Sequence, residues 1–181
     1  VLVGVLGLLV FMIFAASWRA ARFFAYLDPW EISNAQGKAY QLSHSLIAFG
    51  RGETWGVGLG DAIEKQHYLP EAHTDFILAI VGEELGFVGA VVVILLFILL
   101  IVRGYYIAMH ARDRFGALLA AGISTHIALQ TFLNIGVVTN FLPATGISLP
   151  FFSYGGTALL MQLFEAGIVL AVSRQNDNKL L

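Results

Sequence analysis

The sequence predicts an all-α integral membrane protein: a polytopic helical bundle of about four transmembrane helices with one large extracytoplasmic loop. Hydrophobic residues make up 58% of the chain and charged residues 12%, whereas charged residues make up about 25% of a typical soluble domain. The mean hydropathy is +0.79. Four segments are apolar over the length that crosses a hydrocarbon core, about 20 residues of helix. A soluble fold is therefore excluded.

The four apolar segments comprise, in chain order, residues 1–18, 76–102, 115–142 and 157–172. The first is short and begins without a methionine or a charged n-region, so we expect it to lie inside a longer protein and not to be a signal peptide. Between the first and second segments, residues 19–74 are polar and contain several glycines and two tryptophans. This stretch is the large loop.

The basic residues predict the orientation of the spans. The connector after the second segment and the C-terminal tail contain Arg103, Arg112, Arg114, Arg174 and Lys179. Basic residues next to membrane helices favour the cytoplasm, which places residues 19–74 and the sequence FLPATGISLPFFSYGG outside. Arg19 and Arg22 oppose this orientation, but they are fewer. Anion binding at the membrane surface would account for that pair.

The third span carries a polar stripe. Gly122, His126, Gln130 and Asn134 recur every four residues and so share one face of a helix. Unpaired polar groups in lipid are costly, so this face must meet other helices or a wet cavity, through hydrogen bonds between helices or substrate contacts. Glu165 lies mid-span in the fourth segment, and we expect it to face the bundle.

Composition excludes several functions. The net charge of −2, without a basic run, argues against nucleic-acid binding. With no cysteine, there is no disulfide framework, thiolate nucleophile or cysteine metal site. The glycines of GVGLG follow no predicted strand and precede no phosphate-binding lysine, so they predict a tight loop and not a nucleotide site.

Several motifs in order resemble one family. The run LDPW, then YQLSHSLIAFGRGETWGVGLGDAIEKQHYLPEAHTDFILAIVGEELGFVG, then LPATGISLPFFSYGGTALL, resembles the SEDS family (shape, elongation, division, sporulation) of bacterial cell-wall proteins. FGRGE and YLPEAHTDF are most similar to its FtsW division branch, although His67 and Glu165 depart from the residues usual there. Family members have more membrane helices, so the resemblance implies that residues 1–181 form the C-terminal part of a single membrane domain.

The resemblance implies a function: a peptidoglycan glycosyltransferase that polymerises lipid II, the undecaprenyl-pyrophosphate-linked disaccharide peptide, during septal cell-wall synthesis. Its implied setting is the bacterial cytoplasmic (inner) membrane at the division septum. A class B penicillin-binding protein, other divisome membrane proteins and membrane lipid are the implied partners. Because upstream helices would complete the polar cavity, we expect this chain alone to be inactive.

The segment LPEAHTDF holds the candidate active site. The resemblance carries the catalytic aspartate onto Asp75, and carries Glu71, His73 and Lys65 over as neighbours that bind substrate. Glycosyl transfer from a lipid diphosphate needs a base for the acceptor hydroxyl, which a carboxylate supplies. It also needs positive charge for the leaving group, for which Arg51 is a second candidate.

Two further residues complete the predicted substrate-binding set. If a helix begins at Pro70, Glu83 lies roughly 80° around it from Asp75 and within reach of the site. Ser153 supplies a hydroxyl in the flexible SYGG sequence before the last span. Carboxylates beside a diphosphate also make Mg²⁺ a candidate cofactor, and the sequence does not decide whether a metal binds.

Other interpretations remain open. Lys65 and Arg51 also fit solvated loop charges, and His73 also fits a packing or capping residue. Two other classes of function use the same polar cavity: a lipid II flippase, which needs no general base, and a non-enzymatic scaffold that positions a penicillin-binding protein. Without the resemblance, the residues do not separate these three.

Overall fold

The computed structural model describes residues 26–30, 40–64, 69 and 73–177, and this part of the chain is all-helical, without a strand. Its helices are α4 (Tyr40–Gly52), α5 (Ile77–Met109), α6 (Arg114–Val138) and α7 (Gly156–Asp177). Three of them, α5, α6 and α7, are long and apolar enough to cross a membrane. The predicted fold class is therefore confirmed, whereas the predicted span at residues 1–18 lies outside the described residues.

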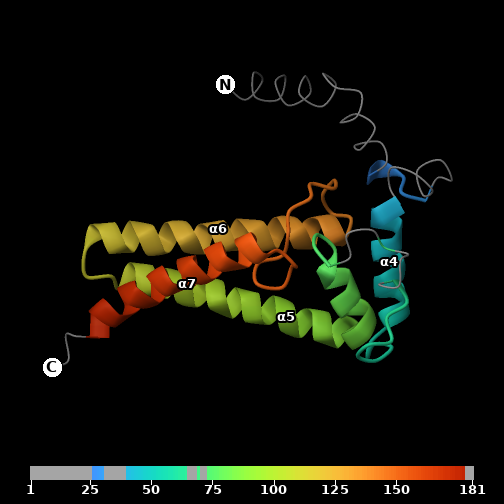
Figure 1. The fold of residues 1–181 in the computed structure, drawn as a ribbon, viewed down its shortest axis with the longest axis horizontal. Helices are drawn as coiled ribbons and strands as arrows, with labels where there is room; N and C mark the ends of the chain where they lie inside the picture. The colour runs from blue at the N-terminus through green and yellow to red at the C-terminus, as the bar shows by residue number, and fades with distance from the viewer. Residues whose placement is uncertain (1–25, 31–39, 65–68, 70–72, 178–181) are drawn as a thin grey trace, which may run out of the picture.

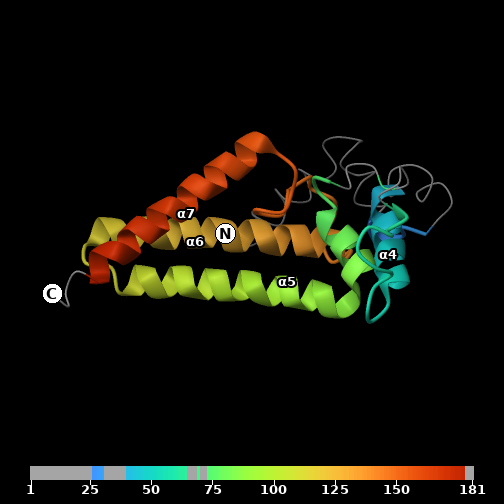
Figure 2. The same ribbon diagram turned by 60° about the horizontal axis from the view of Figure 1, so that its bottom comes forward.

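The two longest helices, α5 and α6, lie side by side and antiparallel (Figure 1). A short turn joins them, and the Asp113 side chain caps α6 by accepting a hydrogen bond from the Gly116 backbone at 2.9 Å. Near its C-terminal end α7 packs on this pair, where Val172 contacts Ile107 and Ala120. Toward its N-terminus α7 rises away from both (Figure 2). The axes of α7 and the α5–α6 pair therefore diverge toward the other end of the bundle.

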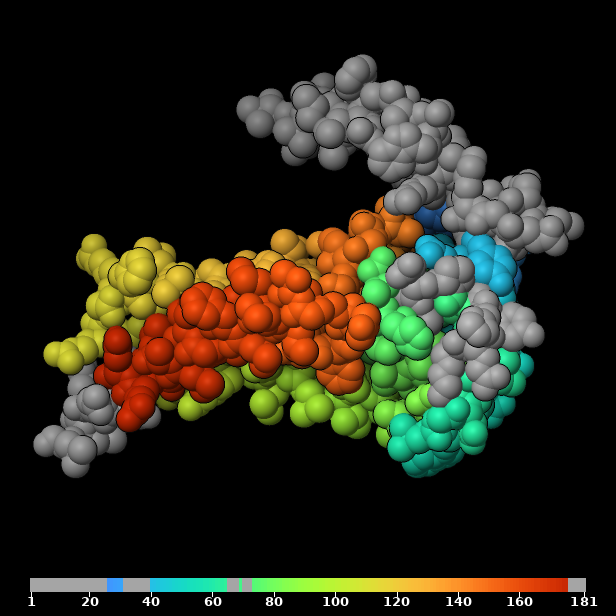
Figure 3. Space-filling view, in the orientation of Figure 1, coloured from blue at the N-terminus to red at the C-terminus, as the bar shows by residue number. Residues whose placement is uncertain are grey.

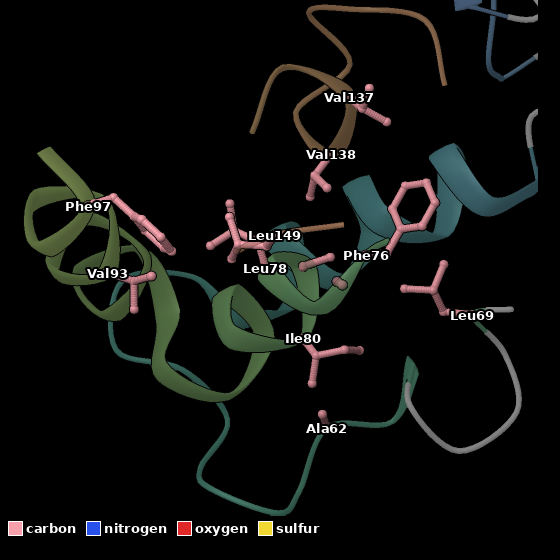
Figure 4. Close-up of a cluster of buried hydrophobic side chains, with 12 residues drawn as sticks. Ala62, Leu69, Phe76, Leu78, Ile80, Val93, Phe97, Val137, Val138 and Leu149 are labelled. Atoms are coloured by element: carbon pink, nitrogen blue, oxygen red, sulfur yellow. The ribbon is translucent and has the colours of Figure 1, made fainter. Parts of the chain in front are cut away.

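The main hydrophobic core lies at that other end, where α4 runs across the bundle (Figure 1). Side chains from α4, the start of α5, the end of α6 and the loop before α7 meet there (Figure 4). Fully or nearly fully buried members include Ala48, Phe76, Leu78, Val138 and Leu149. This core fixes the end of α5 that carries the predicted active-site segment.

A kink interrupts α5 at Gly86, whose φ of 69° and ψ of −169° are accessible essentially only to glycine. A break in a helix leaves backbone groups without partners, and residues 53–58 supply them. The N–H groups of Val57 and Gly58 donate to the carbonyls of Glu83 (2.9 Å) and Glu84 (3.1 Å), respectively. In return, the N–H groups of Phe87 and Val88 donate to the carbonyls of Glu53 (2.9 Å) and Thr54 (3.2 Å).

The glycines of GVGLG turn the loop as the sequence predicts. Gly56, Gly58 and Gly60 have φ of 82°, 117° and 92°, in the region that side chains disfavour. A Cβ at Gly56 would also lie 2.1 Å from the Glu84 carbonyl oxygen, so only glycine fits beside the kink.

Candidate functional site

The Asp75 segment is a turn and not the first turn of a helix. Residues 73–76 form turns, Phe76 is the N-cap, and α5 begins at Ile77. The prediction of a helix that starts at Pro70 and already contains Asp75 is therefore wrong.

Hydrogen bonds to three successive backbone carbonyls hold residues 73–75 in this turn. The His73 carbonyl accepts a hydrogen bond from the Tyr154 N–H (2.7 Å), and the Thr74 carbonyl accepts one from Ser153 Oγ (2.5 Å). Asn134 Nδ2 donates to the Asp75 carbonyl at 2.7 Å. These donors come from α6 and the loop before α7, so tertiary contacts fix the backbone on both sides of Asp75.

The loop before α7 is itself held in place. Asn134 donates a second bond from the same nitrogen to the Ile147 carbonyl (2.7 Å), and Gln130 Nε2 donates to the Ser148 carbonyl (3.0 Å). Ser153 Oγ also accepts from the Leu149 N–H (2.7 Å). In the space-filling view this loop, in orange, abuts the start of α5, in green (Figure 3). The loop and Asp75 thus form one fixed unit.

Gly146 lies beside the Asp75 carboxylate. Gly146 has φ of 74°, and a Cβ added there would lie 3.4 Å from Asp75 Oδ2. The backbone angle favours glycine at this position, and a Cβ there would make an ordinary contact with the carboxylate. The Asp75 side chain is half-buried, so a bound molecule can reach it.

Two clefts flank this unit. One, of about 470 Å³, lies between α6 and α7 and includes Gly146, His126, Gln130 and Glu165 in its lining. The other, of about 430 Å³, includes His73, Ile77, Ser153, Tyr154 and Leu159. The loop before α7 contributes to both clefts, and polar side chains lie within their mainly apolar linings.

The predicted stripe on α6 faces this region. His126 Nδ1 lies 3.2 Å from Glu165 Oε1 on α7, and Gln130 and Asn134 bond the loop as described above. Glu165 therefore faces the bundle as predicted. Gly122, the fourth stripe position, borders open space. Three stripe residues therefore find partners within the chain, whereas Asn134 Oδ1 is buried without a hydrogen-bond partner among the described residues, so the expectation that upstream helices complete the cavity stays a prediction.

The other predicted site residues in the described part gather around Glu64. Arg51 Nη1 lies 3.3 Å from Glu64 Oε1, and His44 Nδ1 lies 2.6 Å from Glu64 Oε2. The fully buried Glu83 carboxylate accepts hydrogen bonds from the Ile63 N–H (3.0 Å) and the Glu64 N–H (3.3 Å). This geometry makes Glu83 a structural clamp between α5 and the loop.

The predicted site thus falls into two groups. Asp75, His73 and Ser153 share the turn and its loop, whereas Arg51 and Glu83 meet at Glu64. Lys65 and Glu71 lie outside the described residues. Within the described residues no group of three His, Asp or Glu side chains is arranged to hold a metal ion, and Glu83 is engaged by backbone N–H groups.

Three residues around the Asp75 turn and its loop are absent from the set of site residues predicted from the sequence. Asn134 was placed only on the stripe, although it bonds the Asp75 backbone. Gln162, 6% exposed, accepts the Phe151 N–H at 2.7 Å and anchors the loop on α7. Its signal was a polar side chain within an apolar span. Gly146 gave no signal, because its role depends on a close approach in space.

Comparison with known proteins identifies the family. Residues 1–178 match the sequence model of the FtsW, RodA and SpoVE family, described as cell cycle proteins. The chain is 54% identical over 177 residues to the probable peptidoglycan glycosyltransferase FtsW of Thiomonas intermedia (strain K12), covering 96% of this chain and 43% of the relative. It is 51% identical over 173 residues to the protein of the same name from Burkholderia thailandensis, covering 94% and 37%. The chain therefore spans less than half the length of these relatives.

A solved structure supports the same family assignment. A chain from work on the structural coordination of polymerization and crosslinking by a peptidoglycan synthase complex superimposes with a TM-score of 0.70 at 28% identity. The match covers 97% of this chain and 48% of that chain. With membrane-spanning helices, the motifs in order and relatives at this identity, the chain belongs to the FtsW, RodA and SpoVE family of multi-pass membrane proteins, in its FtsW branch.

Proposed function

We propose that the full-length protein is a peptidoglycan glycosyltransferase that polymerises lipid II at the extracytoplasmic face of the bacterial cytoplasmic membrane. One observation carries this proposal: Asp75 presents a half-buried carboxylate just before a membrane-spanning helix, on a backbone held by three tertiary hydrogen bonds. Lipid II has its headgroup at the membrane surface and its tail in lipid, so its sugars would lie at the same depth as Asp75. Relatives named probable peptidoglycan glycosyltransferases support the same activity.

In the proposed reaction Asp75 is the general base. Its carboxylate takes the proton of an acceptor sugar hydroxyl as that oxygen attacks the anomeric carbon of a second lipid-linked sugar. The glycosidic bond forms while the bond from carbon to diphosphate oxygen breaks, and undecaprenyl diphosphate leaves. Direct transfer with inversion needs one base and no covalent enzyme intermediate. The Asp75 residue is only half-buried, which is consistent with contact between its carboxylate and an acceptor hydroxyl.

Positive charge near the diphosphate would stabilise the leaving group. Arg51 is one source, because its side chain remains 42% exposed while it contacts Glu64. Lys65 follows Glu64 directly in the sequence and is the second proposed source. In this proposal Glu64 and Glu83 position the cationic segment and do not touch the substrate.

Polymerisation needs sites for two sugar-bearing substrates, and the two clefts beside the Asp75 turn offer them. The cleft that includes Gly146 lies between α6 and α7 and is lined by polar and apolar side chains. The cleft that includes His73 and Ser153 is similar in volume, about 430 Å³. We assign donor and acceptor to these two clefts without deciding which takes which.

A class B penicillin-binding protein is the proposed partner, and the division septum the proposed location, with other divisome membrane proteins nearby. The structural neighbour that coordinates polymerization with crosslinking supports a partner of this kind. Such a partner would crosslink the glycan strands that the polymerase makes.

The test uses the full-length protein with its penicillin-binding partner in proteoliposomes containing labelled lipid II. The proposal predicts glycan polymer that muramidase digests. Movement of lipid II between leaflets without any polymer would instead indicate a flippase. Neither activity, combined with faster crosslinking by the partner on supplied glycan, would indicate a scaffold.

A further inference from the structure

A short uncharged segment lies against the kink of α5. Residues 54–60 (TWGVGLG), here called the loop tip, carry no charge and are flanked by Glu53 and Asp61. Their large side chains point outward: Trp55 is 80% exposed and Leu59 is 77% exposed. An exposed apolar cluster of this kind marks a contact surface. The question is what covers it.

The depth of the loop tip in the membrane follows from α5. Between Glu84 and Arg103 the helix has no charged residue, and this stretch matches the roughly 20 residues that cross a hydrocarbon core. The kink at Gly86 therefore lies at one edge of the core. Four backbone hydrogen bonds tie residues 53–58 to residues 83–88, so the loop tip sits at that edge (Figures 1 and 2).

Part of the loop-tip backbone is already hydrogen-bonded. The N–H groups of Gly56, Val57 and Gly58 donate to the carbonyls of Gly52, Glu83 and Glu84, and the Thr54 carbonyl accepts from Val88. Irregular backbone enters lipid only when its polar groups have partners. The bonds that satisfy the kink of α5 therefore also satisfy these groups of the loop tip, which lowers the cost of placing them in an apolar environment.

The exposed side chains also continue along α5. Phe87, just past the kink, is 67% exposed, and Val92 and Leu95 farther along α5 are 49% and 56% exposed. The loop tip extends this apolar surface sideways at the membrane edge. Tryptophan is enriched at that level, because its ring is amphipathic.

We propose that the loop tip is a membrane anchor: Trp55, Val57 and Leu59 insert into the leaflet next to the start of α5, while Glu53 and Asp61 stay in water. In the predicted orientation this is the outer leaflet. The anchor would hold the kinked end of α5, and the Glu64 cluster that follows the loop tip, at a fixed height above the bilayer. The inference is independent of the proposed enzymatic activity.

The experiment places a bimane fluorophore on single cysteines in the full-length protein, its other cysteines replaced, in nanodiscs. Leu59→Cys is the test site, and Asp61→Cys is the matched control two residues along the same loop. Quenching is measured with lipids that carry a nitroxide near the headgroup, and separately with aqueous iodide. Both sites are exposed, so labelling leaves the packed core intact.

The proposal predicts that nitroxide lipids quench the Leu59 probe more than the Asp61 probe, with blue-shifted emission, and that iodide shows the reverse order. Trp55→Ser should reduce lipid quenching at Leu59, whereas Trp30→Ser, at another exposed tryptophan, should not. Equal iodide quenching at both sites with no lipid quenching would overturn the proposal. Protection of the Leu59 probe only after a penicillin-binding partner is added would overturn it too, in favour of a protein-docking surface.

Discussion

Removing the Asn134 amide should destabilise the turn that carries Asp75. Asn134 is 1% exposed and donates from Nδ2 to two carbonyls, those of Asp75 and Ile147, at 2.7 Å each. Asn134→Ala leaves both acceptors without this donor. Interhelical hydrogen bonds in membrane proteins contribute about 0.6 kcal/mol on average, whereas a buried group left unpaired costs about 1–3 kcal/mol. With two carbonyls involved, the expected loss is about 1–6 kcal/mol.

Thr131 provides the control for this substitution. It lies one turn earlier on α6 and is 4% exposed, and its buried Oγ1 has no hydrogen-bond partner among the residues that the structure describes. Thr131→Val keeps the shape and removes that hydroxyl, so it should be neutral or stabilising. Thermal unfolding of the full-length protein in detergent should give a lower midpoint for Asn134→Ala than for Thr131→Val, together with slower lipid II polymerisation. Equal midpoints and rates for the two variants would refute the reasoning.

Three further predictions concern the loop and the topology. Gly86→Ala places a Cβ 2.3 Å from the Gly56 nitrogen and should lower the free energy of unfolding by at least about 1–3 kcal/mol, whereas Gly122→Ala, whose Cβ meets open space, should not lower it. Equal thermal unfolding midpoints for the two variants would contradict the kink geometry. Glu83→Ala should make the loop near Ile63 more sensitive to protease than Glu83→Gln does, because glutamine keeps an acceptor oxygen for the Ile63 N–H. If Glu83→Gln kept wild-type stability but lost all polymerisation, Glu83 would instead have a role in substrate binding. In intact cells, a cysteine at the exposed position Thr145 should react with a membrane-impermeant thiol reagent, and a cysteine at the exposed position Arg112 should react only after permeabilisation. The opposite pattern would show that the predicted orientation in the membrane is reversed.

Hydropathy and helical period predict the elements of this fold well, because both signals are local. The apolar segments at residues 76–102, 115–142 and 157–172 correspond to α5, α6 and α7. The four-residue spacing also identified the face of α6 that meets the loop and α7. In each case a pattern within one segment reports the environment of that segment.

The details of the site could not be predicted because their causes are far apart in sequence. Ser153 is 79 residues from the Thr74 carbonyl that it bonds, and Asn134 is 59 residues from Asp75. These bonds override the local signal of Pro70, which favoured a helix through Asp75. The contacts of Glu83 escape prediction for a related reason: a helical projection contains no information on the loop whose backbone N–H groups donate to its carboxylate.

The central claim is that Asp75 is the base for glycan polymerisation, and one rate comparison tests it most directly. Asp75→Asn and Asp61→Asn are each built into the full-length protein, purified with its penicillin-binding partner and supplied with lipid II. Both remove one carboxylate from the loop region, but Asp61 is exposed and lies outside the Asp75 turn and its loop. The account predicts that Asp75→Asn still assembles with the partner but polymerises about 10²–10⁴-fold more slowly, whereas Asp61→Asn polymerises at the wild-type rate. Polymerisation by Asp75→Asn at the wild-type rate would contradict it.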